Sequence, residues 1–296
     1  MLAYDIVDVF TDRPFAGNQL AVVHGADGLS TAQCLAVAQE FNFSETTFPS
    51  SAVVDGVGYS TRIFTPGGEI PFAGHPTLGT AWVLRLHGLL SGSEVTQECG
   101  AGRIGVRFLT DMVELAAAPR DLLGPLDDEL VASFLADVGL SQSDLAGPVW
   151  AAGCGLTFAH IPLVEGAVQR AVASVRPLDE YAERLGQPGA LLDPFEGLNL
   201  VHVTGAAPSL DVRSRVFVPG LSVPEDAATG SAAAGLGMAL VASGRLPDGG
   251  TYEITQGVEM GRPSSLRGCV ETTVVRVGGQ VQHVGRGEIA VPPGDR

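Results

Sequence analysis

The sequence predicts an α+β protein with two pseudo-symmetric domains, each a mostly antiparallel sheet curled around one central buried helix. Three observations support this prediction. The two halves of the chain repeat, each repeat contains a strand followed by a glycine-flanked helix, and both helices are apolar on nearly every side. At 296 residues the chain suits two domains. We expect them at residues 1–118 and 119–296, although the last strands could return to the first domain.

The repeat is visible as matching residues that keep the same order in both halves. An offset of 156 positions relates four residues of the first half to four of the second. The matching pairs are Glu69 and Glu225, Gly74 and Gly230, Gly79 and Gly235, and Gly88 and Gly244. A period this long indicates duplicated domains and not a solenoid. Such domains usually pack face to face, so we expect a small-molecule site in a cleft that they share.

The repeated unit begins with a strand, because residues 59–65 alternate in polarity. The helix that follows starts at His75-Pro76, since proline favours the first helical position, and Gly88 is placed to end it. In the second half, Ser231 is the predicted N-cap of the matching helix. Neither helix has a continuous polar face, so each must be buried on all sides. A sheet wrapped around the helix achieves this in a domain of half the chain.

Other segments have readable local signals. Residues 31–41 look helical, with Ser30 as the cap and Asn42 as the end. Four further segments are predicted: a linker over 116–128, helices over 128–138 and 177–185, and strands within 270–291.

The composition excludes several functions. A hydrophobic content of 45% with 17% charged residues predicts packed cores. The net charge of −16 argues against binding to nucleic acids or anionic membranes. All seventeen basic residues are arginine. Without lysine the chain can form neither a pyridoxal Schiff base nor the usual phosphate-loop ATP site.

No cofactor or metal is predicted from motifs. The four cysteines are far apart and form no C-x-x-C pair. The sequence contains no G-x-G-x-x-G after a strand and no H-E-x-x-H or H-x-H pattern. The N-terminus does not resemble a secretory signal, and the longest apolar run is too short and glycine-rich to span a bilayer. A cytoplasmic location is therefore expected.

The two helix starts are candidate binding sites for an anion. The first amides of a helix lack intrahelical partners and carry the positive end of the helix dipole. Gly74 in the first half, and Gly230 with Ser231 in the second, would let a carboxylate approach these amides. The alternative is that these glycines only allow tight turns and close packing.

Three side chains are candidates for chemistry. His75 stands at the first helix start, where it could cap the helix, bind a substrate oxygen or act as an acid. Glu45 lies among three phenylalanines, and loss of water would raise its pKa toward that of a general acid or base. A solvated edge glutamate is the alternative. Asp226 precedes the second helix and is matched by Ile70 in the first half, which favours a role specific to one domain.

Five stretches of the chain together resemble the phenazine-biosynthesis (PhzF-like) family. They cover residues 8–23, 42–48, 69–81, 225–232, and 256–257 with 261–264, in the order that the family has them. One departure is Ala227, where the family often has proline. This difference concerns the stiffness of a loop and leaves the candidate side chains in place.

The resemblance implies a diaminopimelate-epimerase-like fold and a cofactor-free isomerase. Such an enzyme moves a proton within a small cyclic or unsaturated carboxylic acid, and the best-known member acts on trans-2,3-dihydro-3-hydroxyanthranilate. Glu45 would be the proton shuttle, and His75 and Asp226 would orient or polarise the substrate. The helix starts at Gly74 and Gly230-Ser231 would hold its carboxylate. The family also implies a homodimer.

Related racemases of this fold use two facing thiols, one ahead of each helix. The corresponding residues here are Ala73 and Thr229, so we reject a two-thiol mechanism and favour a one-base shift by Glu45. Two alternatives stay open. The protein could bind a small carboxylate without turnover, because a fold does not define a function. It could also be an epimerase that acts on another carbon acid through Glu45 and His75.

Overall fold

The computed structural model describes residues 1–54, 58–173, 180, 195–219, 224–271 and 274–294. The chain divides into two compact units, which are described separately. Unit 1 comprises Met1–Ala116 and Gly278–Arg296, and unit 2 comprises Ala117–Val277. The division falls two residues before the expected boundary, and the last strand is assigned to unit 1. The helix predicted over 177–185 lies outside the described residues.

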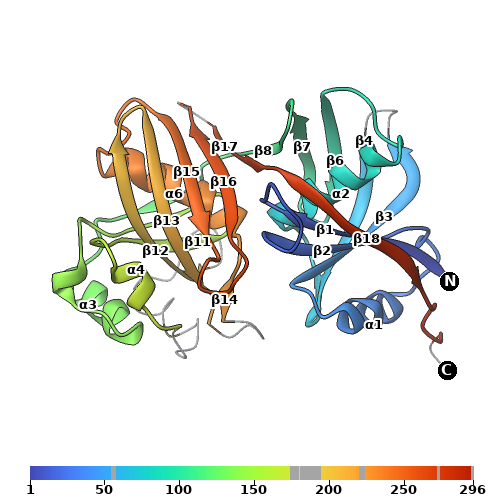
Figure 1. Ribbon diagram of the computed structural model, residues 1–296, viewed down its shortest axis with the longest axis horizontal. Helices are drawn as coiled ribbons and strands as arrows, with labels where there is room; N and C mark the ends of the chain where they lie inside the picture. The colour runs from blue at the N-terminus through green and yellow to red at the C-terminus, as the bar shows by residue number, and fades with distance from the viewer. Residues whose placement is uncertain (55–57, 174–179, 181–194, 220–223, 272–273, 295–296) are drawn as a thin grey trace. The chain divides into compact units, whose positions relative to one another are not determined.

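Unit 1 is built on one strongly curved sheet (Figure 1). Its strands are β1 (Leu2–Val9), β2 (Asn18–Val23), β3 (Glu45–Val54), β4 (Gly58–Thr65), β5 (Gly68–Ile70), β6 (Glu94–Cys99), β7 (Gly102–Phe108), β8 (Val113–Ala117) and β18 (Val281–Ile289). The order across the sheet is β18–β1–β2–β3–β4–β6–β7–β8, and β5 pairs with the end of β4. The pairs are antiparallel except β2–β3 and β4–β6, which are parallel.

Unit 2 repeats this pattern of pairing. Its strands are β9 (Asp121–Leu123), β10 (Trp150–Gly153), β11 (Thr157–Pro162), β12 (Phe195–Ala206), β13 (Ser209–Phe217), β14 (Glu225–Asp226), β15 (Gly250–Gln256), β16 (Ser264–Val270) and β17 (Val275–Gly279). The order β9–β10–β11–β12–β13–β15–β16 contains two parallel pairs, β11–β12 and β13–β15, at the positions that match those of unit 1. The short strand β14 pairs with the end of β13, as β5 does with β4. The predicted duplication is confirmed from β9 to β16, which correspond in order to the strands from β18 to β7 of unit 1.

Each sheet curls around one buried helix, as predicted. In unit 1, α2 (Gly74–Leu86) contacts β1, β2, β3, β6, β7 and β18, and in unit 2, α6 (Gly230–Ala242) contacts β10, β11 and β16. Glycine in the middle of these helices permits the close approach. A Cβ atom at Gly79 would lie 2.6 Å from the Leu20 side chain, and one at Gly235 would lie 2.5 Å from the backbone oxygen of Ala152. The recurring helical glycines therefore have a packing role.

Each unit also contains one or more helices other than its buried central helix. The predicted helix over 31–41 is confirmed as α1 (Thr31–Phe41), with a capping box at Ser30 and left-handed Asn42 at its end. The predicted helix over 128–138 is confirmed as α3 (Asp128–Asp137). A 3₁₀ turn, η1 (Gln142–Asp144), and the four-residue α4 (Ala167–Arg170) follow.

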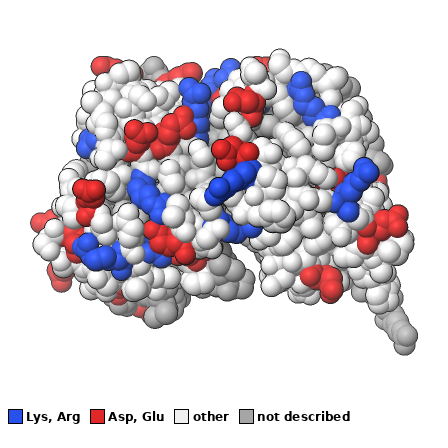
Figure 2. Space-filling model, in the orientation of Figure 1, with Lys and Arg blue, Asp and Glu red and all other residues white. Residues whose placement is uncertain are grey.

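The interpretation of residues 116–128 as a plain linker was wrong. Residues Asp121–Leu123 form β9, which pairs with β10 and so extends the sheet of unit 2. The prolines that suggested a linker, Pro119 and Pro125, flank this short strand. No helix in the described part of the chain has the length and apolar character that crossing a membrane requires. On the face seen in Figure 2, arginine and carboxylate side chains lie interspersed.

Candidate active site

Glu45 is the first residue of β3, and its carboxyl group is largely removed from water. The side chain is 16% exposed, and the Oε2 atom is buried without a hydrogen-bond partner. Burial disfavours the charged form and raises the pKa of Glu45 from 4.5 to about 7, while a hydrogen bond with Ser44 opposes the shift. A solvated edge glutamate, which was the alternative interpretation, does not fit this burial.

His75 lies beside Glu45 at the start of α2. Its side chain is buried, with Nε2 3.4 Å from Oε2 of Glu45 and 3.3 Å from the backbone oxygen of Gln19. Its Nδ1 lies 3.5 Å from the side-chain nitrogen of Asn18. The amide of Asn18 can only donate to Nδ1 and the carbonyl of Gln19 can only accept. Both contacts are therefore satisfied by the neutral tautomer with its proton on Nε2.

Asn18 is a residue of this site that we did not single out from the sequence. It is buried at the start of β2, where its Oδ1 accepts a hydrogen bond of 3.2 Å from the hydroxyl of Ser44. Asn18 thus links the ring of His75 to the residue that precedes Glu45. The signal was a polar residue within one of the stretches that resemble the family, just before an apolar strand.

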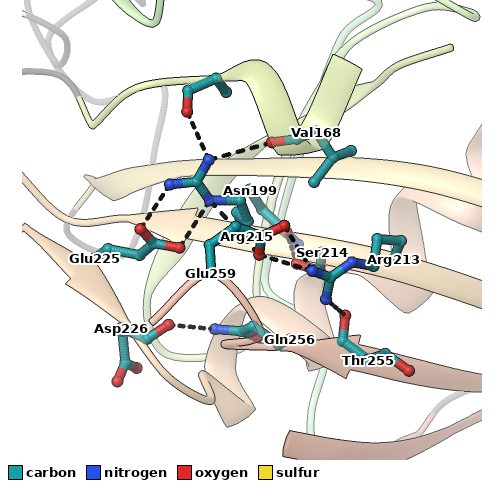
Figure 3. Close-up of polar contacts among 11 residues, drawn as sticks. Val168, Asn199, Arg213, Ser214, Arg215, Glu225, Asp226, Thr255, Gln256 and Glu259 are labelled. Carbon is teal, nitrogen blue, oxygen red and sulfur yellow. Dashed lines mark hydrogen bonds and ion pairs between the residues drawn. The ribbon is translucent and has the colours of Figure 1, made fainter. Parts of the chain in front are cut away.

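Asp226 lies in β14, ahead of α6 in unit 2. Its Oδ2 accepts a hydrogen bond of 2.7 Å from the hydroxyl of Thr229. Its backbone oxygen accepts one of 2.8 Å from the Gln256 side chain, as Figure 3 shows. Gln256 also donates to the hydroxyl of Thr229 at 3.0 Å and accepts from its backbone N–H at 3.4 Å. This network holds Asp226 at the start of α6. Neither Thr229 nor Gln256 was identified from the sequence as a site residue.

The neighbouring Glu225 has a different environment from Asp226. Both of its carboxylate oxygens accept hydrogen bonds of 2.8 Å from Arg215 on β13 (Figure 3). Glu225 therefore forms an ion pair, and Asp226 is the acidic residue that lies next to the helix start.

The predicted start of each helix needs a correction. Ala73 and Thr229, both extended in backbone conformation, are the N-caps, so Gly74 and Gly230 are the first helical residues. Ser231 is the second residue of α6 and not its cap. His75 and Pro76 lie within the first turn of α2. Proline is tolerated there because the first amides need no intrahelical partner.

The two N-cap positions contain no sulfur. Ala73 and Thr229 occupy them, and the cysteines lie elsewhere: Cys34 in α1, Cys99 in β6, Cys154 after β10 and Cys269 in β16. A mechanism with one thiol at each helix start is therefore incompatible with this chain.

The candidate residues fall into two groups, each brought together within its own unit. Unit 1 contains Glu45, His75 and the helix start at Gly74. Unit 2 contains Asp226 and the helix start at Gly230-Ser231.

Other cavities and clusters lie outside these groups. A cavity of about 640 Å³ in unit 1 is lined by residues that include Arg62, Glu69 and Cys99, but by none of the candidate residues. Among the described residues, the group of side chains that is spaced to hold a metal ion surrounds Asp5, also away from these groups.

Comparison with known proteins agrees with this fold. Residues 7–121 and 150–287 match the sequence model of the phenazine biosynthesis-like proteins, PhzC-PhzF. Over 295 residues, the chain is 35% identical to trans-2,3-dihydro-3-hydroxyanthranilate isomerase of Pseudomonas fluorescens, covering 97% of this chain and 99% of that protein.

Two solved structures extend the likeness. A predicted epimerase from Pseudomonas aeruginosa has a TM-score of 0.82 at 31% identity, covering 98% of this chain and 99% of the other. A probable proline racemase from Agrobacterium radiobacter has a TM-score of 0.64 at 13% identity, covering 100% and 94%, which shows a likeness of fold alone.

The duplicated sheets with their central helices define a diaminopimelate-epimerase-like fold, the class of isomerases and epimerases that these likenesses share. Within that class, the chain belongs to the phenazine biosynthesis-like protein family. It is an isomerase of PhzF type.

Proposed function

We propose that this isomerase works without a cofactor and moves a proton within a small unsaturated carboxylic acid, with Glu45 as the group that removes and returns the proton. The observation that carries the proposal is the buried Oε2 of Glu45, which has no hydrogen-bond partner, on a carboxyl group whose pKa is about 7. A carboxyl group with a pKa near the working pH can both accept and donate a proton.

The proposed reaction is a shift on one face of the substrate. The carboxylate of Glu45 takes a proton from one carbon, and the electron pair of the broken C–H bond moves into the adjoining double bonds. The carboxylic acid so formed then returns the proton to another carbon, so the product is an isomer of the substrate. One base that serves both steps needs no partner thiol, in agreement with Ala73 and Thr229 at the N-caps.

The remaining candidate residues bind and orient the substrate in this proposal. His75, which carries its proton on Nε2 beside Glu45, exchanges its hydrogen bond to the backbone oxygen of Gln19 for one to a substrate oxygen. Asp226 orients the same molecule through a second polar group. The first amides of α2 and α6, at Gly74 and at Gly230-Ser231, bind the substrate carboxylate. The positive end of a helix dipole favours an anion there.

The first substrate to test is trans-2,3-dihydro-3-hydroxyanthranilate. This choice rests on the identity of 35% to the Pseudomonas fluorescens isomerase over nearly the full length of both chains. It is a small cyclic carboxylic acid with conjugated double bonds, which suits the proposed shift.

The test follows hydrogen exchange with the solvent. The protein is incubated with this compound in deuterated water, and product formation and deuterium at the new C–H position are measured by NMR and mass spectrometry. We expect Glu45→Gln to lower the rate by about a hundred- to ten-thousand-fold, the usual contribution of a general acid or base. Glu40→Gln is the matched control, because Glu40 is an exposed carboxyl group on α1. Isomerisation at the wild-type rate by Glu45→Gln would remove Glu45 from the mechanism.

A further inference from the structure

Three of the six histidines in the chain converge on one aspartate in unit 1, outside the candidate active site. The Oδ2 atom of Asp5 lies 2.8 Å from Nε2 of His24 and 2.8 Å from Nε2 of His87. Its Oδ1 atom lies 2.8 Å from Nε2 of His283. The Asp5 side chain is only 3% exposed, so the histidines surround a carboxylate that is almost completely removed from water.

Strand register explains why these four residues meet. Val7 and Val9 of β1 lie under Gly79 of α2, so the face of β1 that carries Asp5 is the face that α2 covers. His283 of β18 pairs with Val7 of β1, just beyond a bulge in that pair of strands, and therefore points to the same face.

The other two histidines reach this face from neighbouring elements. His24 follows β2 and donates its backbone N–H to Ala3 of β1, so it lies beside Asp5. His87 is the C-cap of α2 and closes the group from the helix side.

The chemistry of this group is that of a metal site. Imidazole nitrogens and a carboxylate oxygen are the ligands that zinc binds in proteins, usually four of them in a tetrahedron. The ligand atoms of Asp5, His24 and His87 all lie within 4.8 Å of one another. Bonds of about 2.0–2.1 Å place tetrahedral ligand atoms roughly 3.3 Å apart. Small rotations of these three side chains therefore suffice to enclose an ion, while His283 stays hydrogen-bonded to the other oxygen of Asp5, outside the group.

Access and electrostatics favour a cation here. The side chains of His24, His87 and His283 are 22%, 37% and 33% exposed, so an ion can enter from solvent. The C-terminal end of α2, which His87 caps, carries about half a negative charge. The carboxylate of Asp5 adds a full negative charge beside it. If the histidines served only to hydrogen-bond Asp5, one of them would be enough. Instead, three ring nitrogens from three segments point at the same carboxylate.

We propose that Asp5, His24 and His87 bind a Zn²⁺ ion in unit 1, with water at the fourth position. His283, on the other oxygen of Asp5, would orient the carboxylate, as residues that support metal ligands commonly do. The ion would join β1, the end of β2 and the end of α2. Motif searches miss it because the histidines are separated from Asp5 by 19, 82 and 278 residues. The proposal is independent of the chemistry at Glu45.

The test is zinc binding to the full chain. The protein is treated with a chelator and dialysed, and zinc chloride is then titrated by calorimetry while thermal unfolding is followed with and without zinc. We expect one ion per chain and a higher midpoint of unfolding with zinc, because an ion that binds only the folded state stabilises it. His24→Gln and His87→Gln should weaken binding by about a hundredfold or more, since even residues that only support a ligand contribute 10–100-fold. His202→Gln is the matched control, because His202 lies in unit 2 and contacts the backbone of Leu163.

Two further measurements distinguish the loss of a zinc ligand from a failure of the variant to fold. Circular dichroism checks each variant, and the exposed position of His87 makes His87→Gln the mildest change. Cobalt bound to the wild-type protein should give the visible bands of a tetrahedral site with nitrogen and oxygen ligands, and zinc should abolish them. The proposal is overturned if the wild-type chain binds no stoichiometric zinc, or if the cobalt spectrum shows thiolate ligands. It is equally overturned if folded His24→Gln and His87→Gln bind zinc as the wild type does.

Discussion

Arg215 holds Glu225 by two parallel hydrogen bonds, Nε to Oε1 and Nη2 to Oε2, each 2.8 Å long. In the other unit Arg62 holds Glu69 through the same atoms, at 2.8 and 2.6 Å. Each arginine also lies over the phenylalanine two residues further along its strand. The same ion pair therefore precedes the central helix in both units, α2 in one and α6 in the other. This repetition gives Glu69 and Glu225 a structural role.

The two copies of this ion pair differ in burial, which predicts a difference in their contribution to stability. Arg215 and Glu225 are 9% and 13% exposed, whereas Arg62 and Glu69 are 36% and 38% exposed. Removing one partner of a buried pair leaves an uncompensated charge and costs about 3–5 kcal/mol, while exposed pairs contribute roughly 0–1 kcal/mol. We expect Glu225→Gln to lower the free energy of unfolding by about 2–3 kcal/mol, because Glu259, 4.0 Å from Arg215, offsets part of the remaining charge. Glu69→Gln should lower it by less than about 1 kcal/mol. Urea denaturation of both variants measures the difference, and equal losses would contradict it.

Signals that lie within a few residues of one another predicted the fold well. The cap at Ser30 and the left-handed end at Asn42 bound α1 as expected, because capping depends on local hydrogen bonds. Gly88 and Gly244 follow the two central helices in the left-handed conformation that glycine allows. The starts of those helices were less predictable. Thr229 is the N-cap of α6 in place of Ser231, but its hydroxyl makes no capping hydrogen bond. That hydroxyl instead contacts Asp226 and Gln256, which lie on other elements.

The candidate site was predictable only in part, for a related reason. Burial of Glu45 followed from its apolar neighbours in the sequence, and His75 was marked by the helix start. The partners that hold these residues come from other strands, as Asn18 does, and their polar atoms give no periodic signal. The group around Asp5 is the extreme case. Its members are distant in sequence and meet through the pairing of β1 with β2 and β18 and through the end of α2, which carries His87.

The space around Gly79 in α2 and Gly235 in α6 predicts how well each helix tolerates an added methyl group. Alanine favours a helix over glycine by about 1 kcal/mol, but overpacking a core costs about 1–3 kcal/mol. At Gly235 the added Cβ meets the backbone oxygen of Ala152 at 2.5 Å, which can move little. At Gly79 it meets the flexible end of Leu20 at 2.6 Å.

We therefore expect Gly235→Ala to destabilise the protein clearly, by about 2 kcal/mol, and more than Gly79→Ala does. Gly28→Ala is the control, because an added Cβ there has no neighbour within 4 Å. Thermal and urea unfolding report the order of the three variants. If Gly235→Ala is as stable as the wild type, the prediction is wrong, and the backbone of β10 at Ala152 can move to make room for the added methyl group.

Burial of Glu45 predicts a pH-dependent stability. The folded state binds the proton of this carboxyl group more tightly than the unfolded state, with a pKa of about 7 against 4.5. Its stabilising contribution is thus fully present below the unfolded pKa and is lost as the pH rises through the folded pKa. One pKa unit corresponds to about 1.4 kcal/mol.

Between about pH 5 and pH 8, the wild-type free energy of unfolding should fall by about 2–3 kcal/mol relative to that of Glu45→Gln. The variant keeps all other titrating groups, so the difference between the two pH profiles isolates Glu45. Parallel profiles from urea denaturation would mean that the carboxyl group is hydrated in solution.

The same carboxyl group predicts the pH dependence of catalysis, on the proposal that Glu45 starts the reaction as a base. Only the ionised form accepts a proton, so kcat/KM should rise with pH and level off above about 7. Glu45→Asp keeps an ionisable group but withdraws it from the substrate by one methylene. We expect this variant to have a lower kcat with a pH-dependent rate, whereas the residual rate of Glu45→Gln should lose this dependence. Steady-state rates with trans-2,3-dihydro-3-hydroxyanthranilate across this pH range measure all three proteins. A wild-type rate that falls as pH rises through about 7 would instead assign Glu45 the role of an acid in the first step.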